Sequence, residues 1–145
     1  MRTVKQLLDN KDRDVWTISP DSSVYDALRL MADKNIGALI VMDGDRMAGI
    51  FSERDYARKV VLEGKFSRET PVKEIMTSEV YSVTPDRTIK DCMAVMTRGR
   101  FRHLPVTQDE KVVGVVSIGD VVKALLSEQD YLIAQLENFI AGGRG

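Results

Sequence analysis

"VWTISPDSSVYDALRLM" (residues 15–31) aligns with "VYSVTPDRTIKDCMAVM" (residues 80–96) at an offset of 65 residues. The same offset places "ALIVMDGDRMAGIFSERD" (38–55) on "HLPVTQDEKVVGVVSIGD" (103–120), with no gap in between. Chance similarity does not hold one register over such a length, so the chain contains an internal duplication. We therefore start from two copies of one structural unit.

Each copy is predicted to fold as β-α-β-β-α. A short apolar strand ends at Pro20 or Pro85, because proline cannot continue the hydrogen-bonding ladder of a sheet. The following helix has apolar residues at helical spacing, and the next two strands flank a polar turn. The expected elements are strands 16–19 and 81–84, helices capped by Ser23 and Thr88, hairpins 38–51 and 103–116, and closing helices 53–62 and 118–126.

The expected fold class is mixed α/β (α+β), with two repeats related by pseudo-two-fold symmetry. We assign residues 1–63 to the first copy with an N-terminal helix, 64–71 to a polar linker, 72–126 to the second copy and 127–145 to a C-terminal amphipathic helix and tail. The apolar stripe of that last segment must be buried against another surface, which is either the other copy or a second subunit.

Composition excludes several function classes. The net charge is −1, from 21 Lys and Arg against 22 Asp and Glu, so broad nucleic-acid or anionic-membrane binding is not expected. The single cysteine excludes an internal disulfide, and with one histidine it excludes a usual zinc site. No signal peptide, membrane span or catalytic set is visible. We expect a cytoplasmic protein that is not an enzyme and holds no metal.

The doubled motif resembles the CBS domain. The pattern of the resemblance is a strand ending in Ser/Thr-Pro, a helix, an "LPV"-like strand, and Gly-apolar-apolar-Ser-x-x-Asp, here "TISP…ALIV…GIFSERD" and "SVTP…HLPV…GVVSIGD". Two such domains in tandem make a Bateman module, and the chain is similar to the small stand-alone bacterial type. The resemblance implies an adenine-nucleotide sensor with clefts between the copies, and modules that pair into homodimers.

Ser117 and Asp120 are candidate contacts of a ribose. Backbone N–H groups at the start of a helix attract anions, and Asp120 lies one turn in, on the same side as Ser117. A carboxylate there can accept hydrogen bonds from both ribose hydroxyls, and Gly119 leaves space for the sugar. The alternative is a capping box that only satisfies the helix end. Ser52, Arg54 and Asp55 are the equivalents in the first copy, with Arg54 as an added phosphate contact.

By the same resemblance, the adenine side of each cleft comes from the opposite copy. One cleft would combine Ser19, Ile36, Gly37 and Ala38 with Ser117 and Asp120, and the other Thr84, Phe101, Arg102 and His103 with Ser52 and Asp55. The small residues at 37 and 38 would let a flat purine lie against the backbone; the alternative is that they only begin a strand.

The basic stretch "TRGRFRHLPV" (97–106) supplies charge for phosphates. Family members often carry His or Arg at the positions of Arg102 and His103, where they meet nucleotide phosphates. The alternative is a solvated loop, and we expect Arg98 and Arg100 to be solvated.

We expect a regulatory or energy-sensing module that binds AMP or another adenylate, namely ADP, ATP, NAD or S-adenosylmethionine. The module transmits its ligand state to an unidentified partner protein. One alternative is a protein-interaction or dimerisation module with vestigial clefts. Another is a nucleic-acid binder using Arg98, Arg100 and Arg102, against which the net charge argues.

Overall fold

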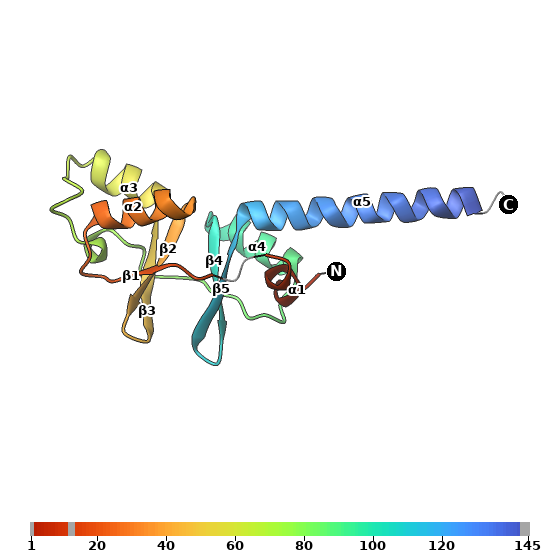
Figure 1. The fold of residues 1–145 in the computed structure, drawn as a ribbon, viewed down its shortest axis with the longest axis horizontal. Helices are drawn as coiled ribbons and strands as arrows, with labels where there is room; N and C mark the ends of the chain where they lie inside the picture. The colour runs from red at the N-terminus through yellow and green to blue at the C-terminus, as the bar shows by residue number, and fades with distance from the viewer. Residues whose placement is uncertain (1, 12–13, 143–145) are drawn as a thin grey trace.

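The two copies fold alike, each as a β-hairpin covered by helices, and they lie side by side (Figure 1). The computed structural model describes residues 2–11 and 14–142. In the first half, the elements are α1 Val4–Asp9, β1 Thr17–Ile18, α2 Val24–Lys34, β2 Ala38–Asp43, β3 Arg46–Ser52, α3 Glu53–Tyr56 and the π-helical η1 Ala57–Val61. In the second half, they are the 3-10 helix η2 Val72–Glu74, α4 Ile89–Gly99, β4 His103–Gln108, β5 Lys111–Ser117 and α5 Ile118–Gly142. The predicted fold class is confirmed.

The hairpins of the two copies have the same register. Val41 faces Gly49 in the first, and Val106 faces Gly114 in the second. Each hairpin has an irregularity directly after that valine, so even the local bend is repeated.

The predicted strand 81–84 is wrong, and Pro105 explains why. In the first copy, the N–H of Ile40 donates to the carbonyl of Trp16 (3.3 Å) and helps to hold β1 against β2. Pro105 stands at the position of Ile40 and has no N–H, so the equivalent bond to Tyr81 cannot form. Only a single parallel bridge, Val83 to Val106, remains.

The segments that precede the two copies are exchanged between them. Val4, Leu7 and Leu8 of α1 are buried in the core of the second copy, whereas Val72 and Ile75 are buried in the core of the first. The sequence places α1 in front of the first copy, but its apolar side completes the second.

Backbone hydrogen bonds hold both crossings in the same way. Val4 N donates to Arg87 O (2.7 Å), and Val72 N donates to Ser22 O (2.8 Å). Arg87 and Ser22 are equivalent in the repeat, so the exchange follows the pseudo-two-fold symmetry of the duplication.

Two repeated glycines allow these crossings. A Cβ atom built on Gly49 would lie 2.6 Å from the carbonyl oxygen of Thr77, and one on Gly114 would lie 2.8 Å from Cδ2 of Leu8. Neither distance is tolerable, so both crossing segments pass at positions where only glycine fits without a shift.

The second closing helix does not end near Leu126, because residues 120–141 contain neither glycine nor proline. It continues as α5 to Gly142 and projects beyond both repeats (Figure 1). The tail expected after it, residues 143–145, lies outside the described residues. Within the part of the chain that the structure describes, no helix is long and apolar enough to cross a membrane.

Candidate functional site

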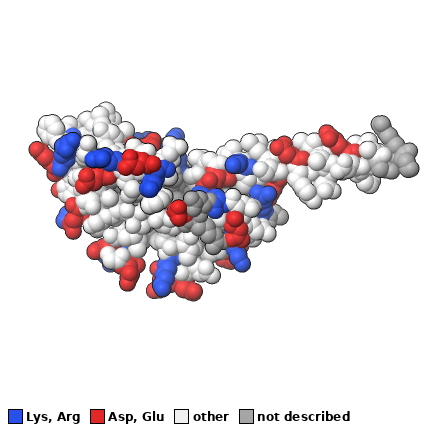
Figure 2. Space-filling view, viewed as in Figure 1, with Lys and Arg blue, Asp and Glu red and all other residues white. Residues whose placement is uncertain are grey.

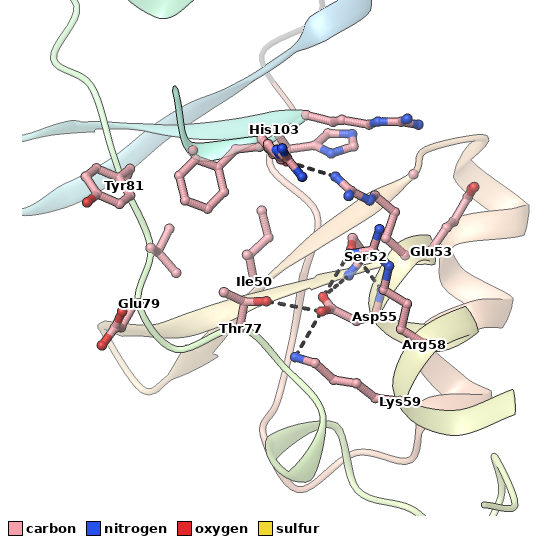
Figure 3. A pocket seen from close by; sticks show the side chains of 17 residues that line it. Ile50, Ser52, Glu53, Asp55, Arg58, Lys59, Thr77, Glu79, Tyr81 and His103 are labelled. Carbon is pink, nitrogen blue, oxygen red and sulfur yellow. Dashed lines mark hydrogen bonds and ion pairs between the residues drawn. The ribbon is translucent and has the colours of Figure 1, made fainter. Parts of the chain in front are cut away.

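A pocket of about 470 Å³ opens between the two copies (Figure 3). The end of β3 and the start of α3 form one side, and the turn before β4 forms the other. The segment 77–81, which follows the crossing from one copy to the other, closes the third side. The pocket therefore collects side chains that are far apart in the sequence but that the duplication places face to face.

Asp55 is the most buried charged residue of the pocket, with 8% exposure. Its Oδ2 accepts hydrogen bonds from the backbone N–H and the hydroxyl of Ser52, both at 3.0 Å, and Ser52 Oγ accepts from the Asp55 N–H. The capping box, which the sequence offered as the alternative to ribose binding, is therefore formed.

The other oxygen of Asp55 faces the pocket. Its Oδ1 accepts a hydrogen bond from Thr77 Oγ1 at 3.1 Å and lies 3.2 Å from Lys59 Nζ (Figure 3). The Lys59 side chain is 42% exposed and also donates to the carbonyl oxygen of Ile75 at 3.2 Å, so moving it away from Asp55 costs this one hydrogen bond and the ion pair. Capping by Oδ2 and acceptance of an outside hydroxyl by Oδ1 are thus compatible.

An aromatic pair forms the wall opposite the carboxylate. The ring centroids of Tyr81 and Phe101 are 5.1 Å apart and the rings are tilted by 40°. Ile50 and Val80 also line this part of the pocket. Tyr81 is 60% exposed, so part of this apolar wall is open to a flat ring from solvent.

Basic side chains dominate the pocket lining, with five Lys and Arg residues against three Asp and Glu residues. Arg54 donates from Nη1 to the carbonyl oxygen of Arg100 at 2.8 Å and so links α3 to the end of α4. Arg100 adopts the left-handed conformation that ends α4 (φ 58°), and Arg58 and Arg102 also line the pocket. The local excess of positive charge contrasts with the net charge of −1 for the whole chain.

His103 lies where the two copies meet. A Cβ on Gly37 would lie 3.5 Å from both Cε1 and Nε2 of His103, so the ring packs against the start of β2. Burial lowers the pKa of His103, and Lys11 and Arg102 lower it further, while Asp120 opposes them. The imidazole is therefore neutral at neutral pH and adds no fixed positive charge to the pocket.

Ser117 and Asp120 form the same cap in the second copy. Ser117 N donates to Asp120 Oδ2 at 2.9 Å, and Asp120 N donates to Ser117 Oγ at 3.1 Å. Lys11 Nζ lies 2.6 Å from the same Oδ2 and also donates to the carbonyl of Val115. Burial raises the pKa of Asp120, but the hydrogen bonds from Lys11 and Ser117 outweigh it and hold the pKa below its usual value.

The structure divides the expected site residues into two groups. Seven line the pocket: Gly37, Ser52, Arg54, Asp55, Phe101, Arg102 and His103. Seven are not among its lining residues: Ser19, Ile36, Ala38, Thr84, Ser117, Gly119 and Asp120. Gly37, expected beside Ser117 and Asp120, lines the pocket of Asp55. Thr84 lines a separate hollow and donates its hydroxyl hydrogen to Asp86.

Sequence reasoning missed several side chains of the site. Arg58, Lys59 and Thr77 lie outside the motif that carried the resemblance. Arg100 is exposed, as expected, but it also lines the pocket. Tyr81 had one signal, since it stands where the first copy has Trp16.

Comparison with known proteins identifies the family. The model of the CBS domain matches residues 4–62 and 72–127. The mitochondrial CBS domain-containing protein CBSX3 of Arabidopsis thaliana is 42% identical over 97% of this chain and 73% of its own length. A structure of a protein with CBS domains from Burkholderia ambifaria is 51% identical, covers 88% of this chain and 96% of that one, and has a TM-score of 0.85.

A more distant structure has the same fold with ligands bound. It is the CBS domain pair of protein MJ0100 in complex with 5′-methylthioadenosine and S-adenosyl-L-methionine, which is 23% identical and has a TM-score of 0.79. It covers 88% of this chain and 98% of that one. The chain therefore belongs to the CBS-domain family, as a tandem pair of CBS domains.

Proposed function

We propose that this CBS pair is a non-enzymatic regulatory module that binds an AMP-like adenylate in the pocket of Asp55. The observation that carries the proposal is that one pocket combines a buried carboxylate, an open aromatic wall and a rim of arginines. These are the three groups that a ribose, a purine and a phosphate require.

The pocket offers one orientation for such a ligand. The purine stacks on Tyr81 and Phe101, and the ribose hydroxyls donate to Oδ1 of Asp55 once Lys59 has moved aside. The phosphate then lies toward the arginines, where Arg54 and Arg102 form charge-assisted hydrogen bonds.

The excess of basic groups favours a phosphate over a sulfonium. MJ0100 holds S-adenosylmethionine, which carries a positive charge on sulfur and an amino-acid tail. Five Lys and Arg residues in this pocket would repel that sulfonium, whereas they attract AMP, ADP, ATP or the pyrophosphate of NAD. We therefore place phosphate-bearing adenylates before S-adenosylmethionine.

Ligand binding is proposed to change the spacing or angle of the two copies. Asp55 and Arg54 belong to the first copy, whereas Phe101 and Arg102 belong to the second, so one ligand would touch both. The hydrogen bond from Arg54 to Arg100 already crosses this boundary. A ligand that binds the two arrangements with different affinity shifts their populations, and a partner protein or the second subunit of a homodimer would read the change.

One observation favours a second function, an interaction module with vestigial clefts. Both carboxylates are already paired with lysines, Asp55 with Lys59 and Asp120 with Lys11. In that case no nucleotide would bind, and the two copies would serve as a scaffold.

A thermal-shift series separates the two functions. We expect AMP, ADP, ATP or NAD to raise the melting temperature of the full chain at millimolar concentration, with adenosine and S-adenosylmethionine giving smaller shifts. Absence of stabilisation by every adenylate, with the protein folded, would overturn nucleotide binding and leave the scaffold function.

A further inference from the structure

The outer part of α5 projects away from both copies and exposes an apolar stripe (Figure 1). The stripe follows alternating steps of four and three residues, the spacing typical of helices that pair in coiled coils. Its members are Val122, Leu126, Gln129, Ile133, Leu136 and Ile140. The five apolar members are between 43% and 61% exposed. An exposed apolar stripe of this length marks an interaction surface.

The charges beside the stripe limit what can cover it. Lys123, Asp130 and Glu137 follow one flank at intervals of seven residues, and residues 127–142 contain no Lys or Arg. On the face seen in Figure 2, the outer part of the projecting helix accordingly shows acidic but no basic side chains. A helix that lies on an anionic membrane usually has a basic polar face, so a lipid surface does not fit. The partner must offer an apolar stripe of its own and a cation for Glu137.

We infer that this partner is a second copy of the chain, whose α5 packs against the first in antiparallel orientation. The inference does not rest on the proposed nucleotide site. With the two-fold axis passing near Tyr131, each stripe residue meets a stripe residue of the other copy: Leu126 with Leu136, Ile133 with Gln129, and Ile140 with Val122. Such a contact is self-complementary and closes at two copies.

Charge complementarity and full pairing of the stripe together favour this register. Lys123 of one copy lies beside Glu137 of the other, and the symmetry forms the pair twice. Sliding the helices outward by one heptad would bring Asp130 beside Glu137, which is a repulsive pair. Sliding the helices inward by one heptad would still pair Lys123 with Asp130, but it would leave Leu136 and Ile140 without a stripe residue opposite them. A parallel arrangement would put both acids beside the apolar flank of Leu125 and Leu132, where no cation faces them.

The oligomeric state of the full chain tests the surface. Ile133→Asp places a charge in the stripe, and Asn138→Asp places the same charge on the opposite face as the matched control. By light scattering we expect the natural chain and Asn138→Asp to be dimers and Ile133→Asp to be a monomer with unchanged circular dichroism. A natural chain that stays monomeric at millimolar concentration would overturn the inference, as would a dimer that survives Ile133→Asp.

The register has two tests of its own. Lys123→Glu should weaken the dimer by about tenfold, and adding Glu137→Lys should restore it, because the ion pair then has reversed signs. A double variant no tighter than Lys123→Glu would contradict the register. In the antiparallel pair, residue 130 of one helix lies next to residue 130 of the other. The variant Asp130→Cys should therefore form an intermolecular disulfide under mild oxidation. Cross-linking of Ile133→Cys in its place would show parallel pairing and overturn the antiparallel arrangement.

Discussion

Lys11 donates a 2.6 Å hydrogen bond to Asp120, which follows it by 109 residues. The equivalent carboxylate in the first copy, Asp55, has the same cap but is ion-paired with Lys59 and accepts a hydrogen bond from Thr77. The two repeats therefore hold the same carboxylate with different neighbours. Lys11 comes from the N-terminal segment that crosses to the second copy, so this ion pair also stabilises the packing of that segment on the second copy.

Removal of the Lys11 cation should destabilise the protein above the pKa of Asp120. The folded-state pKa of Asp120 is below its usual value, so its contribution is present above about pH 4 and is lost as pH falls through the folded pKa. We expect Lys11→Met to lower the free energy of unfolding by about 1 kcal/mol at pH 7, because the pair is partly exposed. Urea unfolding should show this difference shrinking at pH 3; a difference independent of pH would refute the ion pair as its cause.

His103 should make stability depend on pH in a second window. Its folded-state pKa lies below the usual value of about 6.5, because burial disfavours the imidazolium. As pH falls, the imidazole therefore takes up a proton at a higher pH in the unfolded chain than in the folded one. The free energy of unfolding decreases as pH drops from about 6.5 toward the folded pKa. His103→Gln should flatten this part of the curve of unfolding free energy against pH. A curve of His103→Gln that keeps the full slope of the natural chain would contradict this assignment.

The two crossing glycines should differ in their tolerance of alanine. In Gly49→Ala the new Cβ meets the backbone oxygen of Thr77, which cannot move alone, whereas in Gly114→Ala it meets the flexible end of Leu8. We expect losses of about 3 kcal/mol and about 1 kcal/mol respectively, by urea unfolding. Equal losses at the two positions would show that the close approach at Gly49 is not rigid.

Cys92 should be unreactive in the folded protein. It is buried in the core of the second copy, and burial raises the pKa of its thiol to about 11. Because the thiolate is the reactive form, alkylation at pH 8 should be slow and should accelerate when urea unfolds the chain. Rapid alkylation under native conditions would show that this core opens.

The duplication predicted the order of helices and strands because apolar spacing is a local property of the chain. It did not predict that the strand expected at Tyr81 is absent. That absence depends on Pro105, which lies in a different element and has no N–H to donate. The duplication also did not predict which core receives α1, because the apolar side of Val4 and Leu8 fits either copy equally well by pattern alone.

The candidate site was predictable only where the two copies repeat. Ser52 and Asp55 could be identified as candidates because Ser117 and Asp120 occupy the equivalent positions of the second copy. Lys11 reaches its carboxylate only through the exchanged crossing, and the crossing of the equivalent segment brings Thr77 to Asp55. Nothing local in the sequence marks either contact.

Titration of AMP into three forms of the protein tests the central claim most directly. By calorimetry, the natural chain should bind AMP, and Asp55→Asn should bind it at least about tenfold more weakly, because the amide is a poorer acceptor for the ribose hydroxyls. Asp120→Asn, which makes the same change outside the pocket, should keep the affinity of the natural chain. Loss of binding in Asp120→Asn with full binding in Asp55→Asn would contradict the proposed site.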